Sequence, residues 1–326
     1  MNQPPTDGIR VPATTLCDFV TDIFRNVSLP EDHASLVAEC LVDTDLRGVV
    51  SHGVTQVERY VRGFQANKIN PQPEICVLRE GPVTAALSGG GGLGFIASAR
   101  AMAMAIIKAK DLGIGTVTTT NHDHMGSCGV YVRMALREQF IGVCCAGRSA
   151  ALSYDYRQTI AGSIQGSPPM ALGIPSGPQE PPILLDFGTK LNWDEDCFRK
   201  IPEAYLRMIG LSHIANILGG TLGGMMLPEF NGDDTEYNAR VGEGSICLAI
   251  DIERFTSLQA FQDDMDHLMQ AIRQMNPLPG YDASHLPGSR EWRWEKDHLQ
   301  NGVPISAEAK SSLERLGKEL ACDVPW

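Results

Sequence analysis

Apolar residues recur along the chain with two spacings, one typical of amphipathic helices and one typical of strands. The helical spacing predicts helices at residues 12–26, 31–46, 55–67, 95–112, 130–137, 205–222 and 255–275, and in a charged, Trp-bearing segment after residue 290. Short apolar or β-branched runs predict strands at residues 82–88, 115–120, 141–146, 183–186 and 245–251. Segments 151–182 and 228–244 are rich in polar and turn-forming residues, and we expect loops there.

The length and composition are those of a packed globular protein. At 326 residues the chain is long for one core, so we expect two domains or an interleaved architecture. Apolar residues make up 43% and charged residues 20%, and no apolar run approaches the roughly 18 residues of a bilayer span. A formal net charge of −12 argues against a nucleic-acid partner, because phosphate binding needs clustered Lys and Arg. We therefore expect neither a nucleic acid nor a membrane as a partner.

Nine cysteines are scattered along the chain, mostly within apolar runs and without a C-x-x-C pair. This pattern indicates reduced core residues rather than a disulfide framework. The N-terminus is polar and lacks the apolar region of an export signal. We expect a cytoplasmic protein.

A run of glycines, Gly89-Gly-Gly-Gly92-Leu-Gly94, precedes the helix at 95–112. Such a run could cradle a phosphate at the helix N-terminus. It lacks both the G-x-G-x-x-G fingerprint and a Walker lysine, so a Rossmann domain is not supported. A tight turn that permits close helix packing is the favoured interpretation.

Two histidine motifs are the strongest chemical signals: Arg47-Gly-Val-Val-Ser51-His52-Gly53 and Asn121-His-Asp-His124-Met-Gly126. A positioned imidazole can both accept and donate a proton near neutral pH. Ser51 could hydrogen-bond a substrate oxygen beside His52. Asn121 and Asp123 could fix the tautomer of His124. The motifs therefore predict an enzyme with two proton-transferring histidines.

Two other chemistries fit the sequence less well. His122, Asp123 and His124 are possible metal ligands, but no HExxH motif or cysteine pair accompanies them. The segment Gly147-Arg-Ser149-Ala-Ala151 does not match the G-x-S-x-G elbow of a serine hydrolase. We expect no metal site and no acyl transfer.

The chain resembles the non-Rossmann malate/L-lactate dehydrogenase family. That family also contains ureidoglycolate and sulfolactate dehydrogenases, diketogulonate reductase and cyclic imino acid reductases. The resemblance is densest in Asp45-Leu-Arg-Gly-Val-Val-Ser-His-Gly-Val54 and Asn121-x-x-His124-x-Gly126. It continues, in family order, in the segments 59–61, 69–71, 91–94, 185–186, 248–251 and 286–288.

The resemblance implies an α/β fold peculiar to that family, with a mixed sheet, surrounding helices and a helical N-terminal region. It implies a central cofactor-binding domain at residues 81–251, and a helical domain for substrate and dimerisation formed by residues 1–80 with 252–326. Members are homodimers that transfer a hydride between NAD or NADP and C2 of a small 2-hydroxy, 2-oxo or 2-imino acid.

The resemblance also assigns residues. His52 matches the proton donor of some members and His124 the proton acceptor of others, with Ser51 and Asp186 as polar partners. The expected substrate contacts are Arg47, Gln56 and Arg59. The expected cofactor contacts are Arg148, Ser149, Asp186, Phe187, Gly188, Arg207, Pro287, Gly288 and Ser289.

This chain departs from the family at four places. Gln56 replaces an arginine that could pair with a substrate carboxylate, and the turn near Arg148 lacks the usual serine. The stretch between Asp186 and the helix near Tyr205 is shorter than in relatives, and Arg207-Met208 replaces their Lys-Gly. An alternative is therefore a family member that keeps the fold as a binding or structural homodimer. A lyase or isomerase that uses the two histidines without nicotinamide is a third possibility.

Overall fold

The computed structural model describes residues 3–148, 159–160, 167–192, 194–225 and 242–326. Its centre is a seven-stranded sheet of order β2-β3-β4-β8-β5-β6-β7. The strands are β2 (Cys76–Glu80), β3 (Thr84–Ser88), β4 (Ile114–His122), β5 (Ile141–Arg148), β6 (Pro169–Ile174), β7 (Ile183–Gly188) and β8 (Glu243–Ile250). Only β3 and β4 pair in parallel, joined by helix α4 (Gly94–Leu112), so the sheet is mixed.

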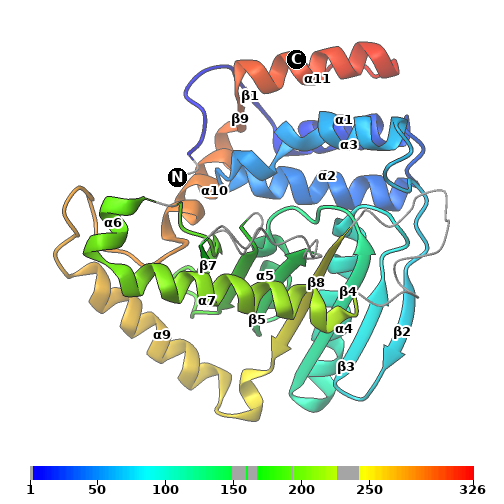
Figure 1. Cartoon of the computed structure of the whole chain (residues 1–326). Helices are drawn as coiled ribbons and strands as arrows, with labels where there is room; N and C mark the ends of the chain where they lie inside the picture. The colour runs from blue at the N-terminus through cyan, green and yellow to red at the C-terminus, as the bar shows by residue number, and fades with distance from the viewer. Residues whose placement is uncertain (1–2, 149–158, 161–166, 193, 226–241) are drawn as a thin grey trace.

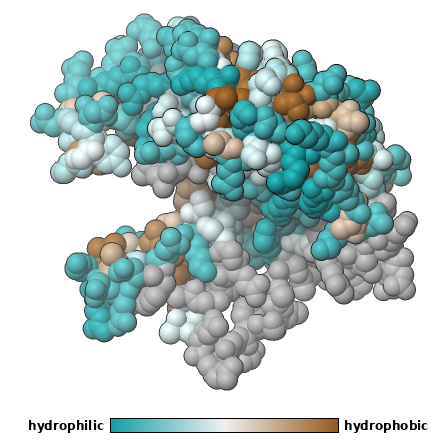
Figure 2. Space-filling model, turned by 90° about the horizontal axis from the view of Figure 1, so that it is seen from above, coloured by the Kyte–Doolittle hydropathy of each residue, from teal (hydrophilic) through white to brown (hydrophobic). Residues whose placement is uncertain are grey.

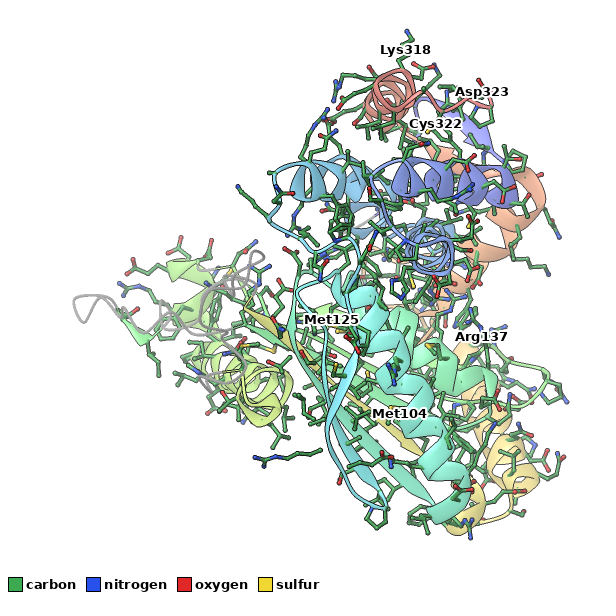
Figure 3. All side chains as sticks on the ribbon, turned by 90° about the vertical axis from the view of Figure 1, so that its right-hand side faces the viewer. Met104, Met125, Arg137, Lys318, Cys322 and Asp323 are labelled. Atoms are coloured by element: carbon green, nitrogen blue, oxygen red, sulfur yellow. The ribbon has the colours of Figure 1, made fainter. Side chains whose placement is uncertain are left out.

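Helices cover both faces of this sheet. Helices α4 and α5 (Cys128–Arg137) bury their apolar sides on one face, where Met102, Tyr131 and Val117 belong to one core cluster. Helix α7 (Pro202–Gly219) packs on the other face through Ala215. Figure 3 shows the sheet almost edge-on, with α4 and α7 on opposite sides. The short α6 (Glu195–Lys200) and α9 (Leu258–Arg273) flank α7 in Figure 1.

A second layer of helices lies over one end of the sheet. It contains α1 (Ala13–Arg25), α2 (Glu31–Leu46), α3 (Val57–Gln65), α10 (Ser289–Asn301) and α11 (Ala307–Leu320). Strand β1 (Ile9–Val11) pairs antiparallel with β9 (Val303–Ile305), which joins the two ends of the chain. Helices α1, α2, α3 and α11 with strands β1 and β9 share a large apolar core. The outer surface is mostly hydrophilic in Figure 2, where a deep notch opens on the left.

The predicted helices and strands are present, and the α/β class with a mixed sheet and a helical N-terminal region is confirmed. The predicted loop at 151–182 is wrong at β6, which lies within it as a strand of the sheet. The predicted loop at 228–244 falls mostly outside the described residues, and its end forms the start of β8. The predicted domain division stays a prediction, and β2 pairs with β3 across its boundary at residue 80.

The glycine run forms a tight turn between β3 and α4. Gly90 and Gly91 have φ of +59° and +74°, which disfavours other residues. A side chain on Gly94 would collide with the Asp123 carbonyl and the His122 ring. The run therefore lets the start of α4 pack closely against the end of β4.

All nine cysteines are free thiols, but Cys76 and Cys197 are exposed, so the expectation of core residues is wrong for these two. Cys76 is the first residue of β2 and Cys197 lies in the first turn of α6, and neither element has a buried residue. No helix among the described residues is long and apolar enough to cross a membrane.

Candidate active site

A cavity of about 930 Å³ lies where the helical layer meets the sheet. Its wall is built from segments far apart in the sequence, at the end of α2, at residues 124–130, at the ends of β5 and β7, and at residues 278–291. Met125, labelled in Figure 3, is buried in this wall between the helices and the sheet. The predicted site residues in the wall are Arg47, His52, His124, Arg148, Asp186, Phe187, Gly188, Pro287 and Gly288.

A short loop between α2 and α3 places His52. Two single 3-10 turns, η1 (Val50–His52) and η2 (Val54–Gln56), flank Gly53. Asp45 lies buried under this loop, and its Oδ2 accepts a hydrogen bond of 2.7 Å from the Val54 amide. Ser51 Oγ lies 2.8 Å from His52 Nδ1, and Ser51 is not part of the cavity wall. Ser51 is thus placed to orient the imidazole rather than to meet a substrate.

His124 follows β4 and reaches the same cavity. Its Nδ1 lies 2.7 Å from the hydroxyl of Tyr60, a fully buried residue of α3. Asp123 accepts a hydrogen bond from the backbone N–H of His124 instead, and Asn121 donates to Ser88. The expectation that Asn121 and Asp123 fix the His124 tautomer is therefore wrong, because both local side chains are turned to other partners.

The two imidazoles lie side by side, with ring centroids 5.6 Å apart and planes tilted by 31°. Each ring has its Nδ1 at a hydroxyl group, which leaves Nε2 as the nitrogen for a ligand in the cavity. One small molecule can therefore contact both rings.

Asp186 on β7 lines the cavity and is exposed there. Its Oδ2 accepts hydrogen bonds from the Ser127 hydroxyl and, at 2.9 Å, from the Gly129 amide. These groups lie at the N-terminus of α5, so the carboxylate caps that helix and faces its positive end. The contact ties β7 to the His124 segment.

Burial controls the protonation of these groups. Desolvation lowers the pKa of His52 below its ordinary value, and Arg59 adds to the effect while nearby Asp186 opposes it. Desolvation, with Arg59 and His52 next in importance, lowers the pKa of His124 to about 3. Desolvation also raises the pKa of Asp186, against the hydrogen bonds from Ser127 and Gly129. His124 is therefore neutral throughout the physiological range.

Arg47 belongs to a buried charge network behind the cavity. Its guanidinium is 3.1 Å from Glu295 and stacks 4.2 Å from the Trp292 ring. Arg133 bonds the same Glu295 and lies 2.7 Å from Asp43. The network connects α2, α5 and α10: Arg133 of α5 joins the helical layer to the side of the sheet, and Arg47 joins α2 to α10 as well as lining the cavity.

Two of the expected substrate contacts lie outside the cavity wall. Gln56 donates to the Ser51 carbonyl at 2.9 Å and so supports the His52 loop. Arg59 is half-exposed, lies 3.6 Å from Asp123, and packs over the Tyr60 ring. Neither residue is therefore placed to contact a ligand in the cavity.

Some of the expected cofactor contacts lie in the cavity wall and others lie outside it. Arg148 lies in the wall and pairs with Glu243, which is largely buried beside it. Ser289 is buried next to the wall but is not part of it, and Ser149 lies outside the described residues. Arg207 is on the solvent side of α7, paired with Glu203 at 2.8 Å. The structure does not bring Arg207 to the cavity.

Sequence reasoning missed four functional candidates, which are Tyr60, Ser127, Glu243 and Asp45. Tyr60 lies within the helix predicted at 55–67, and its spacing gives no sign that its hydroxyl reaches a histidine 64 positions away. Ser127 and Glu243 depend on pairings with β7 and β5 that no local pattern encodes. Asp45 lies among other polar residues, Asp43, Thr44 and Arg47, so the sequence does not show that its side chain is the one buried under the His52 loop.

A metal site finds no support among the described side chains. No group of three or more His, Cys, Asp or Glu in this part of the chain could hold a metal ion. His122 is buried, with its ring nitrogens at Thr119 and the Asp123 carbonyl, so both are already used by protein groups.

A family model, known sequences and solved structures all match this chain, and the matches agree with one another. The profile of the malate/L-lactate dehydrogenase family matches residues 11–191 and 201–314. Malate dehydrogenase of Pyrococcus horikoshii is 29% identical over 357 aligned positions, covering 97% of this chain and 96% of the relative. L-sulfolactate dehydrogenase of Methanocaldococcus jannaschii is 26% identical, covering 94% and 95%. The solved structure of the Pyrococcus horikoshii enzyme superposes with a TM-score of 0.84 at 28% identity, covering 99% of both chains.

The comparison also bears on the segment after Asp186. The family match is interrupted at residues 192–200, around α6, and the alignment of 357 positions is longer than this chain of 326 residues. The relative therefore has residues that this chain lacks. The match nevertheless covers most of the chain and includes both histidine motifs and Asp186. The chain belongs to the malate/L-lactate dehydrogenase family and is an oxidoreductase of the hydroxy-acid type.

Proposed function

We propose that this protein transfers a hydride between a nicotinamide cofactor and C2 of a small 2-hydroxy or 2-oxo acid, or an imino analogue. The observation that carries the proposal is the meeting of His52, His124 and Asp186 at one cavity, with the two rings 5.6 Å apart. A bound nicotinamide supplies or accepts the hydride. The protein has to handle the proton on the substrate oxygen or nitrogen, and His52 or His124 can do so.

The cavity fits a cofactor together with a small substrate. Its volume of about 930 Å³ is near the upper end of the roughly 300–1,000 Å³ typical of ligand pockets. Its wall contains Phe187, Gly188, Pro287 and Gly288, whose small or flat surfaces permit close approach. We propose that the central domain, residues 81–251, binds the cofactor and that the helical domain, residues 1–80 with 252–326, contributes the His52 side.

We further propose NAD rather than NADP. Among the described residues of the wall, Arg47 pairs with Glu295, Arg148 with Glu243, and Arg290 lies 3.8 Å from Glu291. Each cation thus already has a carboxylate nearby, which weakens its attraction for the extra phosphate of NADP. A relative at 23% identity carries the name ureidoglycolate dehydrogenase (NAD(+)), which agrees with this choice.

The test is to mix the purified protein with NADH or NADPH and a panel of 2-oxo acids, following cofactor fluorescence and absorbance. We expect NADH to bind more tightly and at least one acid to be reduced. His52→Ala and His124→Ala should each lower kcat by about 10²–10⁴-fold, and exposed His267→Ala should leave it unchanged. Binding without turnover would favour the non-catalytic alternative, and neither binding nor turnover would contradict the proposal.

We also propose a cytoplasmic homodimer. The free state of all nine thiols supports a reducing compartment. Helix α7 supports the dimer, because its outward side carries Leu206, Ile214 and Ile217, each more than half exposed, with no Asp, Glu, Lys or Arg between residues 208 and 219. Exposed apolar surface of this kind marks contact sites.

Sedimentation analysis tests the dimer. The double substitution Ile214→Lys with Ile217→Lys should yield monomers, because it places two charges in the contact. Ile107→Lys, at an exposed position of α4, should leave the dimer intact. A monomeric wild-type protein would end this part of the proposal.

A further inference from the structure

Tyr60 is the only hydrogen-bond partner of the His124 ring found among the described residues. Its hydroxyl lies 2.7 Å from Nδ1 in a site closed to solvent, and Phe95 packs edge-on against its ring at 5.8 Å. No second partner for this hydroxyl is found in the described part of the chain. The direction of this one hydrogen bond therefore decides the tautomer of His124.

The hydroxyl is the better donor of the two groups. If Nδ1–H donated to Tyr60, the buried O–H of Tyr60 would have no acceptor, which costs free energy. If Tyr60 donates, both polar groups are satisfied and the ring proton is on Nε2. Burial also raises the pKa of Tyr60, so the hydroxyl keeps its proton. The Nε2–H then points away from Tyr60, on the side of the ring that belongs to the cavity wall.

The surroundings also keep His124 neutral. Arg59 from α3, His52 from η1, Arg148 from β5 and His122 from β4 all disfavour an added positive charge, although desolvation is the largest effect. The carboxylates of Asp123 and Glu243 lie close by, but each faces an arginine, Arg59 and Arg148 respectively. An imidazolium would also have to give up the hydrogen bond from Tyr60, because its Nδ1 has no lone pair.

We propose that Tyr60 is a positioning residue that fixes His124 as the neutral Nε2–H tautomer, so that His124 donates a hydrogen bond to the substrate without transferring its proton. The proton is then moved by His52. In the reducing direction, an N–H bond of the His52 imidazolium breaks as the O–H or N–H bond of the product forms, and His52 is left neutral. Ser51, whose hydroxyl lies 2.8 Å from His52 Nδ1, is exposed and connects this ring to solvent protons. This division of roles rests on the proposed dehydrogenase function.

The experiment is nitrogen NMR of the full-length protein labelled at its eight histidines, with a His124→Gln sample to identify the His124 signals. We expect wild-type His124 to show a protonated Nε2 and a bare Nδ1 that does not titrate between pH 5 and pH 8. In Tyr60→Phe, the Nδ1–H and Nε2–H tautomers of His124 should interconvert, and the His124 pKa should rise. It should also lower kcat by roughly 10- to 100-fold with little change in cofactor affinity.

Tyr131→Phe is the matched control. The Tyr131 hydroxyl is also fully buried and donates to the backbone carbonyl of Met125, next to His124. Its loss should lower stability without changing the nitrogen signals of His124. A proton on Nδ1 in the wild-type spectrum, or unchanged signals in Tyr60→Phe, would overturn the proposal. The spectrum needs no substrate, so this result is independent of whether the protein turns over any 2-oxo acid.

Discussion

Adding one methyl group at Gly53 should damage both the fold and the site. A Cβ at this position would lie within 3.0 Å of all three carboxyl atoms of Asp45. The backbone φ of Gly53 is −92°, so the requirement is for space rather than for an unusual conformation. Asp45 is only 2% exposed and has no room to turn away. The Gly53→Ala substitution therefore has to displace either the carboxyl group or the His52 loop by roughly 1 Å or more.

The expected cost follows from two contributions. Overpacking of this kind costs about 1–3 kcal/mol. Displacement of the loop also breaks the 2.7 Å hydrogen bond from the Val54 amide to Asp45, and an unpaired buried donor costs about 1–3 kcal/mol. The sum, about 2–6 kcal/mol, is a large part of the roughly 5–15 kcal/mol that stabilises a typical protein. A displaced His52 should in addition lower kcat/KM by about 10²-fold.

Chemical denaturation and steady-state kinetics measure these effects, and a double-mutant cycle tests their cause. In an Asp45→Ala background the obstructing group is gone, so adding Gly53→Ala should cost far less than it does in the wild type. If Gly53→Ala costs the same in both backgrounds, or leaves stability and activity unchanged, the collision with Asp45 is not what requires glycine here.

Three further predictions concern charge. Burial raises the Asp45 pKa to about 8, so the folded state holds this proton more tightly than the unfolded state. The free energy of unfolding should therefore fall as pH rises from about 4 to 8, by up to about 1.4 kcal/mol per pH unit. Denaturation of Asp45→Asn should not show this fall, and a pH dependence equal to that of the wild type would refute the prediction. Arg133→Met should cost about 3–5 kcal/mol, because it leaves Asp43 with only the exposed Arg137 and Glu295 with only Arg47 as partners for their largely buried carboxylates. Exposed Arg137→Met, which removes only a 3.4 Å pair with Asp43, should cost under about 1 kcal/mol in the same urea titration. Burial lowers the pKa of His52, so the rate of 2-oxo acid reduction should decline as pH rises through a value below 6.5, while the rate of oxidation rises; a reduction rate that increases with pH would count against His52 as the donor.

The sequence was informative where a pattern is local. The apolar spacing of residues 31–46 and 95–112 located α2 and α4, although both helices are buried on nearly all sides over part of their length. The small residues and histidines of the two motifs pointed to His52 and His124. Strands β2 and β6 were missed, because edge positions and a Pro-rich context weaken the alternation that marks a strand.

The partners of the site residues could not be predicted in the same way. Tyr60, Ser127 and Glu243 each act through a contact with an element distant in sequence, and only the folded chain sets that distance. Arg207 was expected at the cofactor because it stands where relatives have the lysine of a Lys-Gly pair. In the fold, that turn of α7 faces solvent, and Arg207 pairs with Glu203 one turn earlier.

The pairing of β1 with β9 has a consequence for biosynthesis. The partner of residues 9–11 is residues 303–305, so the first strand to leave the ribosome waits for nearly the whole chain before it can pair. The carbonyl of Leu46 and the guanidinium of Arg47 likewise wait for His298 and Glu295. The loop that carries His52 therefore reaches its final form only after translation of the last helices. Removal of the segment after residue 288 should leave a truncated chain that cannot assemble the histidine pair, however well the central sheet folds.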